Sequence, residues 1–296
     1  KCVSYCHNPY FLLHNKMTNP TEYWTGHLVN HRRHLNRKES LDYFYWRNSQ
    51  YPGYIELMPV AGQDGKVVLD YGCGPGNDLV GFGEFSKPKK LYGVDISSSA
   101  LSLAEERLAL HDINAELIQI EDSESELPIL SSSVDYIHTS GVLHHCSYPH
   151  AILNEFKRIL KPGGKLSIMV YNYDSIWLHL YVAYVLRIEK GIYRDGSLLD
   201  AFRRSTDGVG CPISNCYKKE DFSELVQSFG FIGGFSGCSI SKHELGLLHK
   251  RNAAIHCSEL ESDHSSFLKS LVIDKDGIPF HGNDVAGIDG CYHFSK

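Results

Sequence analysis

The sequence predicts a doubly wound α/β fold, in which a mostly parallel sheet carries helices on both faces. Short β-branched apolar runs alternate with segments of helical spacing from residue 66 to residue 172, as is typical of parallel sheets. A turn with three glycines follows the first run, and an aspartate ends the second. The chain has 296 residues, 42% of them hydrophobic, so it is long enough to bury a full core.

Five strands are predicted in this middle block, and helices connect them. The strands lie at residues 66–70, 91–95, 115–120, 134–139 and 165–171. The first helix begins near Asn77 or Asp78, because both residue types are good helix caps. Apolar side chains recur at helical spacing in residues 100–110 and 151–160, which predicts two further helices.

The part of the chain after residue 172 breaks this rhythm. We expect helices at residues 176–187 and 222–229, a sixth strand at 231–240 and an Asp-Gly hairpin within 271–279. The last stretch, residues 286–294, is expected to fold back over the sheet.

The first strand runs into a loop with the pattern Asp70-x-Gly72-x-Gly74-x-Gly76. Glycine is needed at such a turn because a β-carbon would block the turn and the approach of a ligand. Asp95 ends the second strand, where a carboxylate can accept hydrogen bonds from both hydroxyls of a ribose. A nicotinamide dinucleotide would use the same acid, but its fingerprint spaces the glycines G-x-G-x-x-G.

Composition and charge exclude several other functions. The net charge of −6 argues against a dedicated nucleic-acid or membrane surface. No run approaches the roughly 18 apolar residues of a membrane helix. The odd count of nine cysteines, with no hydrophobic leader in residues 1–7, favours reduced thiols in a cytoplasmic protein. Cys211 and Cys216 do not supply the four ligands of a structural zinc site, so we expect no metal.

Four segments resemble, in order and spacing, the successive motifs of class I S-adenosylmethionine-dependent methyltransferases. They are VVLDYGCGPG (67–76), LYGVDI (91–96), SVDYIHTSGVLHH (133–145) and FKRILKPGGKLSIMV (156–170). The resemblance covers about residues 60–172. It implies a Rossmann-like, mostly parallel seven-stranded sheet, S-adenosylmethionine as the methyl donor and S-adenosylhomocysteine as the product.

The resemblance also implies which residues hold the cofactor. The glycine loop would lie against its methionine part, Asp95 would hold the ribose, and Asp122 or Ser123 would contact the adenine. Residues 120–124 depart from the usual Gly-Asp-Ala pattern, so the adenine contact stays open between those two. The full set implied is Asp70, Gly72, Cys73, Gly74, Gly76, Asp95, Ile96, Asp122, Ser123, Ser140 and Gly141.

The candidates for a catalytic base are His145 and, after it, His144, because histidine titrates near neutral pH. A His-His pair at the end of a strand is also a common packing feature. Methyl transfer depends mainly on alignment of donor and acceptor, so a base is optional. His145 favours a hydroxyl acceptor slightly over a nitrogen or sulfur acceptor, and the acidic chain favours a small molecule over a nucleic acid.

Aromatic residues before the glycine loop and after the fifth strand are the candidates for acceptor binding. In residues 1–60 these are Tyr23 and Trp24, which either face the acceptor or pack onto the sheet edge. After the fifth strand they are Tyr171 and Tyr173. The basic residues of the first segment could pair with an acceptor carboxylate or phosphate, or form a solvated face. They are Arg32, Arg33, Arg37, Lys38 and Arg47.

The sequence thus predicts an N-terminal helical cap or lid at residues 1–60 and a methyltransferase domain at 61–296. Within that domain, residues 173–220 form an insertion that either builds the acceptor pocket, packs as a helix or meets a second subunit, so a homodimer is possible. The expected function is methyl transfer to a small molecule, with no nucleic-acid or membrane partner. Two alternatives stay open: an NAD-dependent oxidoreductase and a non-catalytic, cofactor-binding regulatory subunit.

Overall fold

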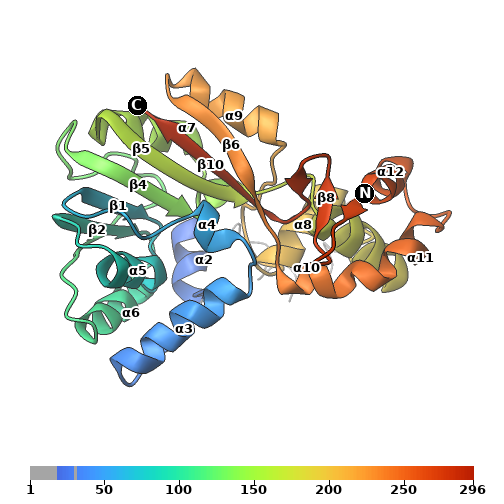
Figure 1. Cartoon of the computed structure of the whole chain (residues 1–296), viewed down its shortest axis with the longest axis horizontal. Coiled ribbons are helices and arrows are strands. Elements are labelled where there is room, and N and C mark those ends of the chain that lie inside the picture. The colour runs from blue at the N-terminus through green and yellow to red at the C-terminus, as the bar shows by residue number, and fades with distance from the viewer. Residues whose placement is uncertain (1–18, 30–31) are drawn as a thin grey trace, which may run out of the picture.

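The computed structural model describes residues 19–29 and 32–296. Predictions for residues 1–18, which include the first part of the cap and the lack of a leader, lie outside the described residues. A seven-stranded sheet forms the centre of the fold (Figure 1). Its strands are β1 (Val67–Tyr71), β2 (Lys90–Asp95), β3 (Glu116–Gln119), β4 (Val134–Ser140), β5 (Leu160–Tyr171), β6 (Ile232–Ser239) and β10 (Asp289–Ser295).

The spatial order of the strands is β3-β2-β1-β4-β5-β10-β6. Strands β1 to β5 run parallel to one another, whereas β10 pairs antiparallel with both β5 and β6. The doubly wound, mostly parallel sheet is therefore confirmed. The expectation that residues 286–294 lie over the sheet is wrong, because β10 inserts between β5 and β6 and satisfies the backbone groups of both.

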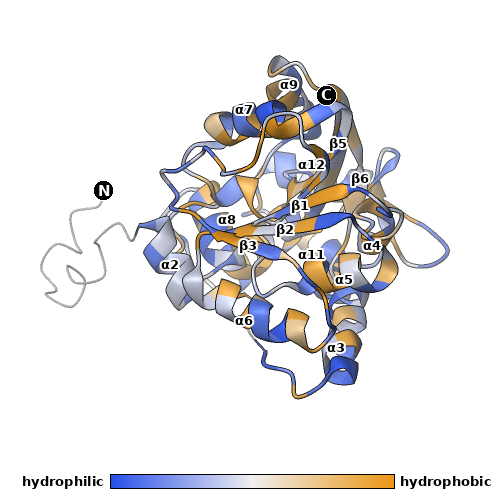
Figure 2. Cartoon of the chain, turned by 90° about the vertical axis from the view of Figure 1, so that its left-hand side faces the viewer, coloured by the Kyte–Doolittle hydropathy of each residue, from blue (hydrophilic) through white to orange (hydrophobic). Residues whose placement is uncertain are grey.

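Helices cover both faces of the sheet (Figures 1 and 2). On one face lie α5 (Asn77–Phe85) and α6 (Ser98–Ala109), and on the other α7 (Pro149–Ile159) and α9 (Lys219–Ser228). Two buried apolar clusters fill the space between the sheet and these helices. The expected cap of α5 is wrong in detail: Gly76 caps the helix at φ 78° with no side-chain hydrogen bond.

The predicted N-terminal helices are present in the described part of the chain. They are α2 (Pro20–Gly26), α3 (Arg37–Ser49) and α4 (Tyr54–Leu57). Phe44 of α3 packs so closely on α5 that a β-carbon at Gly81 would lie 2.7 Å from its ring. Arg107 of α6 donates hydrogen bonds to the Oγ and carbonyl oxygen of Ser40 at 2.7 and 2.9 Å. These contacts hold α3 against the helices that follow the glycine loop.

The insertion after β5 and the segment between β6 and β10 build a second lobe beside the sheet (Figure 1). Its elements are a π-helix, η2 (Trp177–Glu189), the helices α8 (Leu198–Thr206), α10 (Lys242–Leu247), α11 (Arg251–Ile255) and α12 (Ser262–Ser270), and a small sheet of β7 (Val272–Ile273), β8 (Pro279–His281) and β9 (Asp284–Val285). The predicted Asp-Gly hairpin is confirmed, because β7 and β8 pair antiparallel.

A buried carboxylate joins α10 to the start of η2 within this lobe. Glu244 accepts hydrogen bonds from the backbone N–H of Trp177 at 3.0 Å and of Ser241 at 2.8 Å. In the described part of the chain, no helix combines the length and apolar character needed to cross a bilayer.

Candidate functional site

A cavity of about 310 Å³ lies at the carboxyl ends of β1, β2 and β4. This is the edge at which the strand order reverses, and ligands bind there in open α/β sheets. The glycine loop, the ends of β4 and β5, helices α2 and α3 and the loop after α8 all contribute to its wall. The cavity is therefore shared by the sheet, the N-terminal helices and the insertion.

The three glycines of the loop have different roles. A β-carbon at Gly72 (φ 77°) would lie 2.1 Å from the Val142 side chain, and one at Gly76 would lie 3.2 Å from Ala104. At Gly74 (φ 51°) a β-carbon would meet no atom within 4 Å. Since Gly74 also lines the cavity, this open space is available to a ligand.

Asp95 closes the β2 side of the cavity. Its two oxygens accept hydrogen bonds from the backbone N–H of Gly74 and of Ser97, each at 2.8 Å. Burial raises the pKa of Asp95, while these backbone bonds lower it. Each carboxylate oxygen keeps a lone pair for a further donor, which is what the adjacent hydroxyls of a ribose require. Asp122, after β3, also lines the cavity.

A buried ion pair lies under the end of β4. Arg47 Nη1 lies 3.5 Å from Asp78 Oδ1, and its guanidinium lies 4.5 Å from the centre of the Tyr54 ring. The Tyr54 hydroxyl lies 2.7 Å from Ser140 Oγ. Burial alone would raise the pKa of Asp78, but the charge of Arg47 and a hydrogen bond from His138 outweigh it, so that carboxyl stays ionised.

Asp70 lies next to this pair, and its proton is held unusually tightly. Burial raises the pKa of Asp70 to about 7. The nearby His138 lowers this pKa, and the charge of Asp78 raises it further. Asn77 is buried and also lines the cavity, and its Oδ1 has no hydrogen-bond partner within residues 19–29 and 32–296. Two acceptors beside an Arg-Asp pair suit a group that carries both an ammonium and a carboxylate, such as the methionine part of S-adenosylmethionine. The residues present therefore fit this cofactor.

His145 lies on the opposite side of the cavity. Its Nδ1 lies 2.7 Å from the carbonyl oxygen of Ile213, and since a carbonyl only accepts, Nδ1 carries a proton. Its Nε2 lies 3.4 Å from Oδ2 of Asp207. Burial lowers the pKa of His145, and the Asp207 carboxylate raises it in part. The neutral ring thus offers a basic nitrogen beside a carboxylate.

Asp207 is held by tyrosines from two other elements. The Tyr171 hydroxyl donates to both carboxylate oxygens at 3.2 Å each. The Tyr23 hydroxyl donates to the Asp207 backbone carbonyl oxygen, and the neighbouring Trp24 ring lies 4.9 Å from the His145 ring. Helix α2 and the end of β5 therefore fix the position of Asp207 together.

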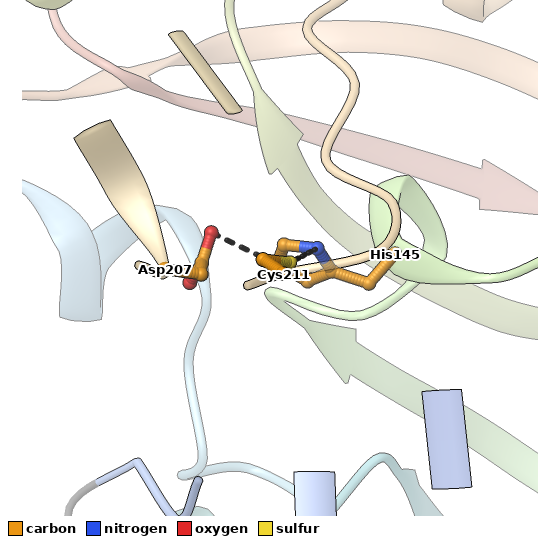
Figure 3. A group of neighbouring side chains, drawn as sticks. All are labelled: His145, Asp207 and Cys211. Atoms are coloured by element: carbon orange, nitrogen blue, oxygen red, sulfur yellow. Dashed lines mark hydrogen bonds and ion pairs between the residues drawn. The ribbon is translucent and has the colours of Figure 1, made fainter. Parts of the chain in front are cut away.

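Cys211 completes a group of three side chains with His145 and Asp207 (Figure 3). One ligand atom of each lies within 4.8 Å of the others, so the group has the donors of a metal site. The Cys211 thiol donates to the Ile213 carbonyl oxygen at 3.2 Å, and burial, then Asp207, raises its pKa to about 12. The thiol and Nδ1–H both donate to the Ile213 carbonyl oxygen, and burial keeps the thiol protonated.

Most of the cofactor residues implied by the sequence line the cavity, but several predicted site residues do not. Gly76 packs on Ala104 instead, and Ser123 is exposed outside the cavity, so of the two residues expected to contact the adenine only Asp122 lines the cavity. His144 is fully buried, with its ring 3.9 Å from that of Tyr171. His144 is therefore no candidate base, since neither nitrogen reaches the cavity.

Two of the expected acceptor residues also fall outside the cavity wall. Tyr173 packs in the apolar cluster of the insertion, and Tyr23 acts through Asp207. Trp24 and Tyr171 do line the cavity. Sequence reasoning missed Tyr51, Tyr54, Asn77, Asp78, Met169 and Asp289. Asn77 and Asp78 follow the glycine loop directly, so their position could have identified them, whereas Asp289 lies far along the chain and had no such signal.

The fold, the glycine loop and the acid at the end of β2 define a class I S-adenosylmethionine-dependent methyltransferase domain. In agreement, residues 63–191 match a family model described as a methyltransferase domain. The identification made from the four sequence motifs is confirmed.

Curated relatives match part of the chain. An uncharacterised 37.1 kDa protein of transposon TN4556 from Streptomyces fradiae is 31% identical over 48% of this chain and 42% of its own length. Erythromycin 3''-O-methyltransferase of Saccharopolyspora erythraea is 28% identical over 60% of this chain and 54% of its own. The chain spans about half the length of these relatives.

Solved structures share the fold at low sequence identity. A phosphoethanolamine N-methyltransferase of Haemonchus contortus has a TM-score of 0.52 and 15% identity, covering 93% of this chain and 59% of that one. A chain from the complex of a Haloferax volcanii methyltransferase with its Trm112 activator has a TM-score of 0.50 and 15% identity, covering 88% of this chain and 92% of that one.

Proposed function

We propose that the protein transfers the methyl group of S-adenosylmethionine to a hydroxyl of a small molecule, and that His145 is the general base. The observation that carries this proposal is the environment of His145. The Ile213 carbonyl oxygen holds the ring with its proton on Nδ1, which leaves Nε2 free to accept one at the cavity. Because His145 can take the proton of a hydroxyl, we expect the enzyme to prefer a hydroxyl acceptor over an amine or a thiol.

The donor side of the cavity has a residue for each part of the cofactor. Asp95 would accept from the ribose hydroxyls, Asp122 would contact the adenine, and Asp70 with Arg47 would bind the amino-acid end. The open space at Gly74 lets the cofactor lie against the loop. When bound, the cofactor supplies a methyl group already activated by a sulfonium.

On the acceptor side, the hydroxyl oxygen would attack the methyl carbon in line with the C–S bond. The new O–C bond forms as that C–S bond breaks, and S-adenosylhomocysteine leaves with the bonding pair. The hydroxyl proton passes to Nε2 of His145, and the Asp207 carboxylate, 3.4 Å away, stabilises the resulting imidazolium. Tyr171 keeps Asp207 in place for this role.

The cavity supports a small acceptor. It measures about 310 Å³, near the lower end of the range for small-molecule sites, and Trp24, His27 and Leu28 of the N-terminal segment line it.

The seven described cysteines are free thiols, which supports the cytoplasmic setting predicted from the cysteine count.

The test is a screen of a metabolite extract with isotope-labelled S-adenosylmethionine, followed by mass spectrometry of the labelled products. We expect a methyl ether as the product. His145→Asn is the matched variant, because its Nδ2 amide can still donate to Ile213 but it lacks a base. It should lower turnover by about a hundredfold and leave S-adenosylhomocysteine affinity unchanged. A product methylated on nitrogen or sulfur, or full activity of His145→Asn, would refute the proposal, and binding without any turnover would indicate a regulatory subunit.

A further inference from the structure

The acceptor side of the cavity contains a chamber formed by Tyr51, Tyr171, Asp207 and Asp289, which we call the acceptor chamber. Tyr171 ends β5, and Asp289 begins β10 as its direct partner in the sheet. Because β5 and β10 lie on the far side of β4 from β2 and β3, the chamber is separate from the Asp95 end of the cavity.

The two carboxylates of the chamber act on both tyrosine hydroxyls. Burial, assisted by the charges of Asp289 and Asp207, raises the pKa of Tyr51 to about 12. Burial and the same two charges also raise the pKa of Tyr171 well above its usual value. Tyr171 also donates to Asp207 and is the cross-strand partner of Asp289, so both carboxylates lie near this tyrosine and give the chamber a negative potential.

The charges that line the cavity are unbalanced. Six carboxylates face two guanidinium groups. Arg47 is already paired with Asp78, and Arg107 is bonded to Ser40. The cofactor adds one net positive charge at the donor end, where Asp70, Asp95 and Asp122 lie. Among the described residues no lysine or arginine forms an ion pair with Asp207 or Asp289, although the charge of Arg47 acts on Asp289.

Of the two carboxylates in the acceptor chamber, Asp289 is better placed than Asp207 to bind a cation. It is 3% exposed, and its Oδ2 accepts from Ser239 Oγ at 3.0 Å. No hydrogen bond to its Oδ1 is found among the described residues, and the residue lines the cavity. Burial raises its pKa to about 6, while the Ser239 hydrogen bond and the charge of Arg47 lower it. Polar groups in a buried place are costly without hydrogen bonds, so a ligand that donates to Oδ1 is favoured there.

We infer that the methyl acceptor carries a protonated amine, which Asp289 binds between the rings of Tyr51 and Tyr171 while the acceptor hydroxyl faces His145. The acceptor is thus an amino alcohol or aminophenol. Carboxylates and aromatic rings together are the groups that bind ammonium ions, whereas an acidic acceptor would be repelled. The inference rests on the proposed function, because it assumes that the acceptor occupies this side of the cavity.

The test compares two probes that share a phenol and differ in one group: tyramine, which carries an ammonium, and 2-(4-hydroxyphenyl)ethanol, which carries a hydroxyl instead. Calorimetry with protein saturated with S-adenosylhomocysteine gives both affinities. We expect tyramine to bind about tenfold more tightly, the usual effect of one charge-assisted hydrogen bond. In Asp289→Asn this ratio should fall to about one, with unchanged affinity for the alcohol. Asp174→Asn, the same charge change outside the cavity wall, should keep the wild-type ratio.

Each other outcome contradicts a specific statement. Equal affinities in the wild type, or no binding of tyramine, would overturn the inference and favour a neutral polyol. A ratio that persists in Asp289→Asn would show that another group recognises the charge. If S-adenosylhomocysteine itself failed to bind, the proposed function would fail first. Should Asp289→Asn not fold, as thermal unfolding would reveal, the wild-type comparison of the two probes still decides.

Discussion

Replacing Gly74 by alanine should damage cofactor binding more than folding. Its φ of 51° is in the left-handed region, where an L-residue costs about 1–2 kcal/mol. No atom lies within 4 Å of the added methyl group in the free protein, so no clash adds to that cost. In the cavity, however, the methyl group would occupy space needed by the cofactor, and overpacking of this kind costs about 1–3 kcal/mol. We therefore expect S-adenosylhomocysteine affinity to fall by about 5- to 150-fold.

Two other glycines provide the controls for this prediction. Gly62 has a φ of 78° and equally open surroundings but lies outside the cavity wall, so Gly62→Ala should lower stability alone. Gly72→Ala would place its methyl group 2.1 Å from Val142 and should lower both stability and affinity. Calorimetry and chemical denaturation measure the two quantities. Wild-type affinity in Gly74→Ala, or an equal loss in Gly62→Ala, would refute the assignment of the loop.

Three further predictions concern protons, packing and metals. Burial raises the pKa of Asp70 to about 7 from about 3.9 in an unfolded chain, so the native state binds the extra proton between these values. The free energy of unfolding should then fall as pH rises from about 4 to about 7. In Asp70→Asn, denaturation curves should show a smaller dependence of this free energy on pH. The same variant should bind the cofactor more weakly. Glu244→Gln should destabilise the protein by about 2–3 kcal/mol, measured by denaturation, since an amide would face backbone N–H donors. A chelator should leave turnover unchanged, because the Cys211 thiol and Nδ1–H of His145 hold their protons; loss of activity on chelation would instead identify a metal centre.

The donor half of the site could be predicted because its signals are local in sequence. The β-strand and helix periodicities of residues 66–172 identify the elements, and the glycine loop and Asp95 occur at fixed places in that pattern. Gly72, Gly74 and Gly76 could be assigned to the turn, although their separate roles depend on Val142 and Ala104, which only the packing brings near.

The acceptor half could be predicted only in part: Trp24, His145 and Tyr171 were expected there and line the cavity, but the contacts that position them join distant segments. His145 is bonded to Ile213, 68 residues away, and Tyr23 to Asp207, 184 residues away. Asp289 enters the cavity because β10 inserts between β5 and β6. No local sequence pattern predicts this strand pairing. The expectation for His144 failed for a related reason: the strand ends before it, and a tight helical turn (Leu143–His145) directs its ring against Tyr171.

The family resemblance reaches further into the donor half of the site than into the acceptor half. Most residues proposed to bind the donor come from the matched segment, with Arg47 as the exception, so their chemistry can be carried over with the motifs. The proposed acceptor chamber instead depends on three contacts that involve residues outside that segment: Tyr23 to the Asp207 carbonyl, Tyr171 to the Asp207 carboxylate and Asp289 to Ser239. We therefore expect substrate choice to depend on how α2, the loop after α8 and β10 converge, and changes in those contacts should alter the acceptor without altering cofactor binding.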